Sequence, residues 1–181
     1  MSEHYLEKFE KITTLLFDVD GVLTDGSVVL VGGGEQARTM YVRDGYALQL
    51  AVKQGFHIGI ISGGRSEEVR KRMNGLGVQN VHLGVENKLD CYETFKHEHN
   101  LTDEQILYVG DDLPDFQVLQ ACGVSCAPAD ADHEIKEIVD YVSPIDGGRG
   151  CVRDIIEKVL RVQKKWFDRN HENHEFKKFF W

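Results

Sequence analysis

Five short apolar runs along the chain predict buried β-strands, at residues 14–17, 57–61, 81–83, 106–109 and 124–127. Amphipathic stretches separate these runs and predict helices at about 44–54, 66–74, 88–98, 113–121, 132–139 and 149–166. Strands that alternate with helices are typical of an α/β fold, in which right-handed crossovers wind a central parallel sheet flanked by helices. Because such sheets bind ligands at the carboxyl ends of their strands, the polar residues that follow each strand are the first candidates for function.

One segment interrupts this alternation shortly after the first strand. Residues 27–31 form an apolar run, glycines follow at 32–34, and the chain continues through 36–42, a pattern that predicts a β-hairpin at about 27–42. No stretch between this hairpin and the second strand is long enough to form a separate lid domain. We therefore expect one domain over residues 1–167, followed by a polar, frayed tail at 168–181.

The overall charge narrows the range of partners. The formal net charge of -9 argues against nucleic acid or an anionic membrane as the main partner, since both require a basic face. Any anionic substrate therefore has to meet a local cationic pocket. The N-terminus is charged and lacks an apolar targeting segment, and no later segment has the length of a membrane span, so we expect a cytoplasmic protein. The four cysteines form no C-x-x-C pair and are interpreted as free thiols.

Two carboxylates, Asp18 and Asp20, stand one residue apart where the first apolar run ends. Alternate residues of a strand share a face, so both side chains point the same way. Like charges this close raise one another's pKa, whereas a bound divalent cation removes that cost. The pair therefore predicts a site for a hard, oxygen-seeking ion such as Mg²⁺.

Three further elements follow later strands. Ser62 is trailed by two glycines, which offers a hydroxyl and backbone N–H groups to a phosphate. Lys88 opens a predicted helix, and the segment 110–115 supplies three carboxylates. Each element alone is more often a turn, a helix cap or a solvated charge. Their combination after successive strands favours metal-assisted phosphoryl transfer through an aspartyl-phosphate.

With these residues the chain resembles the haloacid dehalogenase superfamily of phosphohydrolases. The four motifs of that superfamily are present here as Asp18-Val19-Asp20-Gly21-Val22, Ser62, Lys88 and Gly110-Asp111-Asp112-Leu113-Pro114-Asp115, and the resemblance covers residues 14–160. It implies a Rossmann-like fold of the capless type, because only the predicted hairpin occupies the position where most members insert a cap domain.

The resemblance also implies a role for each motif residue. Asp18 is then the nucleophile that attacks phosphorus, and Asp20 is the general acid for the leaving alkoxide and afterwards the base for water. Ser62 and Lys88 hold the transferring phosphoryl group. Mg²⁺ is held by Asp18, the backbone carbonyl of Asp20 and Asp111, with supporting or outer positions for Asp112 and Asp115.

Two segments, residues 41–46 and 147–153, resemble a narrower family, the phosphatases that act on 3-deoxy-D-manno-octulosonate (KDO) 8-phosphate to make a lipopolysaccharide precursor. Capless members of this kind are homotetramers in which the hairpins form a barrel and a neighbouring subunit covers each active site. The implied contacts to the sugar acid are Arg43, Asp44, Gly45, Arg65, Arg72, Lys88 and Arg149. A guanidinium suits the carboxylate of a 2-keto acid because its forked donors match that anion.

The chain departs from this family at two positions. Gly64 stands where the family has an arginine, with Arg65 one position later, and Gln49 stands where another arginine is expected. An alternative activity is the phosphatase reaction on a nine-carbon acid, 2-keto-3-deoxynonulosonate 9-phosphate or N-acylneuraminate 9-phosphate. An alternative of another class is a non-catalytic oligomerisation module, which loss of motif residues would mark. None of the motif residues is lost here.

Overall fold

A computed structural model of the chain describes residues 5–34, 36–167 and 179–181. Its core is a six-stranded sheet in the order β5-β4-β1-β6-β7-β8, and every neighbouring pair is parallel. The strands are β1 (Thr14–Phe17), β4 (His57–Ser62), β5 (Asn80–Leu83), β6 (Ile106–Val109), β7 (Val124–Ala127) and β8 (Tyr141–Val142). This confirms the predicted α/β fold with its central parallel sheet.

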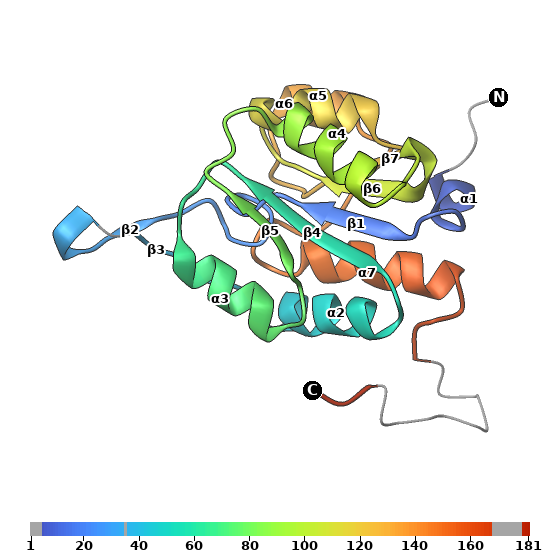
Figure 1. Cartoon of the computed structure of the whole chain (residues 1–181), viewed down its shortest axis with the longest axis horizontal. Coiled ribbons are helices and arrows are strands. Elements are labelled where there is room, and N and C mark those ends of the chain that lie inside the picture. Colours follow the sequence, from blue (N-terminus) through green and yellow to red (C-terminus); the bar gives the residue numbers. More distant parts are fainter. Residues whose placement is uncertain (1–4, 35, 168–178) are drawn as a thin grey trace.

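Helices cover both faces of the sheet (Figure 1). One layer contains α2 (Val42–Lys53), α3 (Glu67–Gly75) and α7 (Cys151–Val162), and the other contains α4 (Lys88–Glu98), α5 (Phe116–Ala121) and α6 (His133–Ile138). A short helix α1 (Tyr5–Phe9) and the 3₁₀ turns Asp103–Gln105 and Leu113–Asp115 complete the body. Apolar side chains fill the space between the sheet and each layer, which gives two separate core clusters. No helix in the described part of the chain is long and apolar enough to cross a membrane.

The central strand β1 positions the functional residues. All four of its residues are buried, as expected for a strand covered by helices on both faces. Its last residue, Phe17, pairs in register with Ile60 of β4 and Val109 of β6. The chain therefore leaves these three neighbouring strands at the same edge of the sheet, and the residues that follow them lie together.

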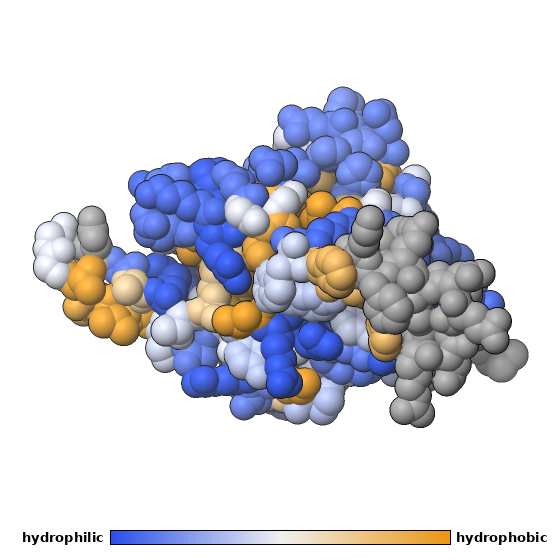
Figure 2. All heavy atoms as spheres, turned by 90° about the horizontal axis from the view of Figure 1, so that it is seen from below, coloured by the Kyte–Doolittle hydropathy of each residue, from blue (hydrophilic) through white to orange (hydrophobic). Residues whose placement is uncertain are grey.

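The predicted hairpin is present but its ladder is short. Strands β2 (Val29–Leu30) and β3 (Gln36–Ala37) are antiparallel, and the 3₁₀ turn Gly32–Gly34 joins them. The hairpin projects from the body (Figure 1), and apolar side chains gather on it (Figure 2). Leu30 is 77% exposed, so the rest of the described chain leaves its side chain largely uncovered.

The predicted tail lies mostly outside the described residues, which omit 168–178. Its last three residues are described and return to α2. The Tyr46 hydroxyl donates a hydrogen bond to the backbone oxygen of Phe179 over 3.0 Å, and the ring of Trp181 lies 5.4 Å from that of Tyr46. The chain therefore ends against the helix that begins with the predicted substrate segment.

Candidate active site

The motif residues predicted from sequence gather at one edge of the sheet. Asp18 and Asp20 follow β1, Ser62 ends β4, Lys88 begins α4 after β5, and Asp111 follows β6. They line a cleft of about 400 Å³ together with Gly63, Gly64, Val85, Glu86, Asp112, Pro114 and Asp115. The four separate motifs thus form one site.

A buried lysine lies at the centre of this cleft. The Lys88 ammonium is 2.6 Å from Asp115 Oδ1 and 3.1 Å from Asp18 Oδ2, and all three side chains are almost inaccessible to solvent. Burial alone would lower the pKa of Lys88, but the two carboxylates together raise it above its usual value. Lys88 therefore carries a fixed positive charge beside the predicted nucleophile.

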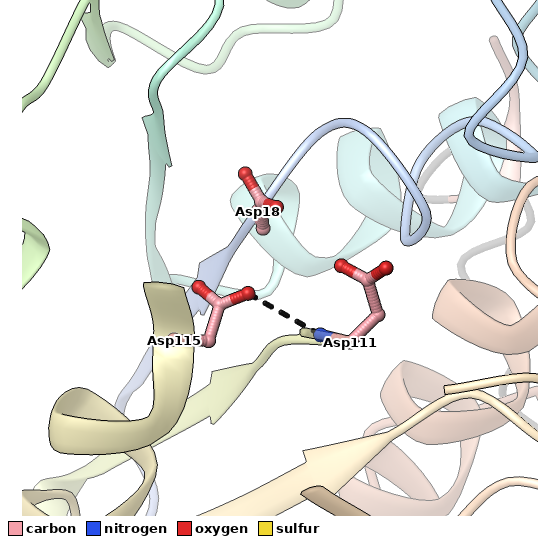
Figure 3. Close-up of side chains that lie close together, drawn as sticks. All are labelled: Asp18, Asp111 and Asp115. Carbon is pink, nitrogen blue, oxygen red and sulfur yellow. Dashed lines mark hydrogen bonds between the residues drawn. The ribbon is translucent and has the colours of Figure 1, made fainter. Parts of the chain in front are cut away.

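Asp115 is held from three directions. It accepts hydrogen bonds from Lys88 and from the hydroxyl of Tyr108, a fully buried residue of β6. The backbone N–H of Asp111 also donates to it over 3.3 Å, shown as the dashed line in Figure 3. These donors hold the Asp115 carboxylate in place, so that it in turn fixes the position of Lys88.

Three carboxylates form a group that fits a cation. One oxygen each of Asp18, Asp111 and Asp115 lies within 4.8 Å of the others (Figure 3). Burial and the charges of Asp18 and Asp115 raise the pKa of Asp111 to about 8, and burial with the charge of Asp115 also raises the pKa of Asp18. Asp111 Oδ1 is buried and has no hydrogen-bond partner. An unpartnered buried oxygen among repelling carboxylates is what a divalent cation would satisfy, so these residues fit one.

The metal ligands predicted from sequence and the three clustered carboxylates share two residues but differ in the third. Asp18 and Asp111 belong to both, whereas Asp115 joins the group through its own carboxylate. The Asp20 side chain points to another partner, and its backbone carbonyl as a ligand stays a prediction. Asp112 is exposed, and its carboxylate accepts a hydrogen bond from the N–H of Leu113, which caps the short 3₁₀ turn.

The partner of Asp20 is Arg38, a residue outside the predicted motifs. Arg38 Nε is 2.6 Å from Asp20 Oδ1, and Nη2 is 3.1 Å from Oδ2, so the guanidinium engages both carboxylate oxygens. Arg38 follows β3 at the base of the hairpin, and it is the only basic residue in the sequence between Asp20 and Arg43. That single charge in an otherwise uncharged or acidic insertion was the available signal.

The predicted phosphate loop lies beside this pair. Ser62 is 2% exposed, and its Oγ accepts a hydrogen bond from the Gly64 N–H over 3.1 Å. Helix α3 begins at Glu67, so the two glycines belong to the loop that precedes it. Both glycines line the cleft beside Ser62.

The predicted substrate segment forms the first turn of α2, and its side chains point in different directions. Arg43 is exposed, whereas Asp44 is 1% exposed and accepts a 2.7 Å hydrogen bond from the backbone N–H of Arg153 in the first turn of α7. Burial raises the pKa of Asp44 to about 6. A Cβ at Gly45 would lie 2.6 Å from Arg72 Nη2, so the absence of a side chain there makes room for Arg72. In this chain Asp44 joins α2 to α7, and its contact with substrate stays a prediction.

The other predicted arginines lie around the cleft and not in it. Arg72 and Arg38 line a neighbouring cavity of about 360 Å³ between the hairpin and α3. Arg65 is exposed and packs over Gly84. Arg149 forms an exposed ion pair with Asp25 at 3.0 Å. In the described part of the chain, the predicted residues Arg65, Arg72 and Arg149 do not line the cleft around Lys88.

The chain is similar to known phosphatases in both sequence and structure. Residues 82–151 match the family model of haloacid dehalogenase-like hydrolases. The 3-deoxy-D-manno-octulosonate 8-phosphate phosphatase KdsC of Salmonella typhi is 37% identical over 91% of this chain and 88% of its own length. The crystal structure of the same enzyme from Yersinia pestis superposes with a TM-score of 0.88 at 33% identity, covering 91% of this chain and 89% of that one. The Moraxella catarrhalis enzyme, in complex with magnesium, phosphate and KDO, has a TM-score of 0.87 at 28% identity, covering 91% and 94%.

Proposed function

Because this chain belongs to the KDO 8-phosphate phosphatases, within the haloacid dehalogenase-like hydrolases, we propose that it hydrolyses KDO 8-phosphate to KDO and inorganic phosphate. It is a phosphatase, and the named substrate of its relatives supports this ester as its own. This activity would supply free KDO for lipopolysaccharide synthesis. The observation that carries the proposal is the buried group of Asp18, Lys88, Asp111 and Asp115 in one cleft with Ser62.

In the proposed reaction Asp18 attacks phosphorus and an aspartyl-phosphate forms on its carboxylate. A carboxylate approaches a phosphate dianion only where positive charge screens it, and Lys88 lies 3.1 Å from Asp18 for that purpose. The Ser62 hydroxyl and the loop amides after it provide uncharged donors for the phosphoryl oxygens. Because Asp115 and Tyr108 hold this arrangement from behind, Lys88 keeps its position before substrate arrives.

Asp20 handles the proton in this proposal. The sugar alkoxide is a poor leaving group, so an acid within reach of the ester oxygen accelerates its departure. The deprotonated Asp20 can then take a proton from the water that hydrolyses the aspartyl-phosphate. Its position in the same cleft as Ser62, two residues after Asp18, supports both steps.

Magnesium is the proposed cofactor, held by the oxygens of Asp18 and Asp111 with Asp115 adjacent. The unpartnered Asp111 Oδ1 and the magnesium in the Moraxella catarrhalis complex support this choice. When bound, the ion would add positive charge next to the phosphoryl group. The protein's own residues would then orient the ester and transfer the proton.

A homotetramer is the proposed assembly. Four consecutive apolar residues, Val28 to Val31, are exposed on the projecting hairpin, and an apolar run of this kind favours contact with another chain. Light scattering of the Leu30→Lys variant should give a smaller particle than wild type. A wild type that is an active monomer would contradict the assembly, and Leu6→Lys is the control for an added surface charge because Leu6 lies on α1, away from the hairpin.

A substrate panel tests the activity. Purified protein with Mg²⁺ is assayed on KDO 8-phosphate, the two nine-carbon acid phosphates and simple hexose phosphates, and KDO 8-phosphate should give the highest kcat/KM. A higher kcat/KM for a nine-carbon ester would overturn the substrate, and no turnover of any ester would favour the non-catalytic module. Asp18→Asn should abolish turnover while the circular dichroism spectrum stays unchanged, and retained activity would exclude Asp18 as the nucleophile.

A further inference from the structure

The hairpin reaches the catalytic cleft through one side chain. Arg38 leaves the end of β3 and its guanidinium binds Asp20 at 2.6 and 3.1 Å. Its side chain is only 9% exposed, although the hairpin to which it belongs projects into solvent. The Asp20–Arg38 pair is thus the point at which the hairpin contacts the residue proposed to move the proton.

The guanidinium is itself held in a fixed orientation. Nη2 donates a second hydrogen bond to Gln36 Oε1 over 3.2 Å. A Cβ built at Gly64 would lie 3.3 Å from Asp20 Oδ2, 3.4 Å from Ser62 Oγ and 3.5 Å from Arg38 Nη2. The three polar groups therefore converge on the space above Gly64, and a side chain there would be in tight contact with Asp20.

We infer that Arg38 is a positioning residue for Asp20, which it holds at the phosphate loop in the orientation that proton transfer requires. The inference rests on the proposed role of Asp20. A forked guanidinium that binds both oxygens fixes the rotamer and the plane of the carboxylate, which a single donor does not. Each oxygen of Asp20 keeps a further lone pair, so the carboxyl can still accept and release a proton while Arg38 is bound.

Orientation matters here because Asp20 has no other hydrogen-bond donor among the described side chains. Without Arg38 the side chain is free to rotate among its staggered rotamers. A displacement of about 1 Å in a catalytic group can cost about 100-fold in rate. Since Arg38 lies on the hairpin, the position of the hairpin base also sets the position of Asp20.

Kinetics of the Arg38→Gln and Arg38→Lys variants test this assignment on the substrate preferred by the wild type. Arg38→Gln should lower kcat by about 10- to 100-fold with little change in KM, because the ester still binds but is protonated poorly. Arg38→Lys, which keeps the positive charge but not the planar fork of donors, should lose less. Arg161→Gln removes one exposed positive charge on α7, far from the cleft, and should leave kcat unchanged.

A double-mutant cycle separates positioning from direct substrate contact. If Arg38 acts only through Asp20, the double variant Asp20→Asn/Arg38→Gln should be no slower than Asp20→Asn alone. With p-nitrophenyl phosphate, whose leaving group needs little protonation, the first-turnover burst of Arg38→Gln should be nearly that of wild type. If Arg38 had only a structural role, Arg38→Gln would lower both kcat on the preferred substrate and the burst rate with p-nitrophenyl phosphate.

Three results would overturn the inference: an unchanged kcat in Arg38→Gln, an effect confined to KM, or additive losses in the double variant. Arg38→Lys keeps the inference testable if Arg38→Gln melts at a much lower temperature. The proposed function fails separately, if wild type hydrolyses no ester or if Asp20→Asn is fully active. An active wild type with an impaired Asp20→Asn and a normal Arg38→Gln would contradict the role of Arg38 alone.

Discussion

Replacing Asp44 by asparagine should remove a pH-dependent loss of stability that the wild-type fold carries. Asp44 is buried between α2 and α7, where Oδ1 accepts the 2.7 Å hydrogen bond from the Arg153 N–H and Oδ2 has no partner. Burial is the largest influence on this carboxyl and raises its pKa, while the amide and charge of Arg153 act in the opposite direction. The net effect is a rise from 3.8 to about 6.

The sign of the effect follows from proton binding. Between these two values the folded state keeps the proton on Asp44 and the unfolded state has lost it, so the free energy of unfolding falls as pH rises. A tenfold change in proton affinity is worth about 1.4 kcal/mol, which makes the total fall about 3 kcal/mol. Asparagine can still accept the hydrogen bond from Arg153 but cannot ionise, so the variant lacks this fall.

The measurement is the free energy of unfolding in urea for wild type and Asp44→Asn, from about pH 4 to about pH 8 in EDTA. The value for the variant minus that for wild type should increase by about 2.4 kcal/mol across this range, because the carboxyl of the unfolded chain is already more than half ionised at about pH 4. Asp18 and Asp111 also titrate there, but they are present in both proteins and cancel in the difference. A constant cost of placing the amide NH₂ at Oδ2 would shift the whole curve without changing its slope.

The matched control is Glu93→Gln, which removes an exposed carboxylate that pairs with Lys96 on the surface of α4. Its difference from wild type should vary by less than about 0.5 kcal/mol over the same range. A difference for Asp44→Asn that stays flat, or that decreases with rising pH, would refute the reasoning. Either result would mean that Asp44 is ionised in the folded chain at low pH.

Two further substitutions test the cleft. Lys88→Met leaves the buried carboxylates of Asp18 and Asp115 without their cation, so it should lower the free energy of unfolding in urea by about 3–5 kcal/mol. The control Lys71→Met removes an exposed lysine and should lower it by less than about 0.5 kcal/mol. Similar small losses in both variants would contradict the role of Lys88. Gly21→Ala places a Cβ 1.9 Å from Asp111 Oδ2 at a φ of 90°, so it should lose about 1–2 kcal/mol of stability and also Mg²⁺ binding by calorimetry. Gly55→Ala has a φ of 87° with no heavy atom within 4 Å, and it should lose stability alone; equal Mg²⁺ binding in the two variants would exclude the steric explanation.

The fold could be predicted from sequence where a strand is buried on both faces, because nearly all of its residues are then apolar. Strands β1, β4 and β6 are covered by helices on both faces, so their apolar runs are unbroken and mark their positions to within a residue. Strand β8 has two half-buried residues at the edge of the sheet and α1 has a single full turn, and neither is long enough to show a period. The hairpin was predicted from its glycines, but its ladder is limited to two residue pairs.

The part of the site that could be predicted from sequence consists of residues at the ends of strands. Asp18, Ser62 and Asp111 follow neighbouring parallel strands, and that topology alone brings them to one edge. Contacts between segments far apart in the chain left no local signal. Tyr108 lies within the apolar run of β6, where the sequence shows a core residue and not a donor to Asp115.

Charge explains why the missed contacts belong to the same site as the predicted ones. When ionised, Asp18, Asp111 and Asp115 carry three negative charges against the single positive charge of Lys88, which leaves two in a buried space. Without a cation, burial and then the charges of Asp18 and Asp115 favour the protonated form of Asp111, which raises its pKa to about 8. A divalent cation would balance the group and release those protons. Asp20 stands outside this balance because Arg38 neutralises it separately. The two carboxylates of the first motif therefore have different partners, Lys88 for Asp18 and Arg38 for Asp20, and a sequence that shows only Asp-x-Asp cannot separate them.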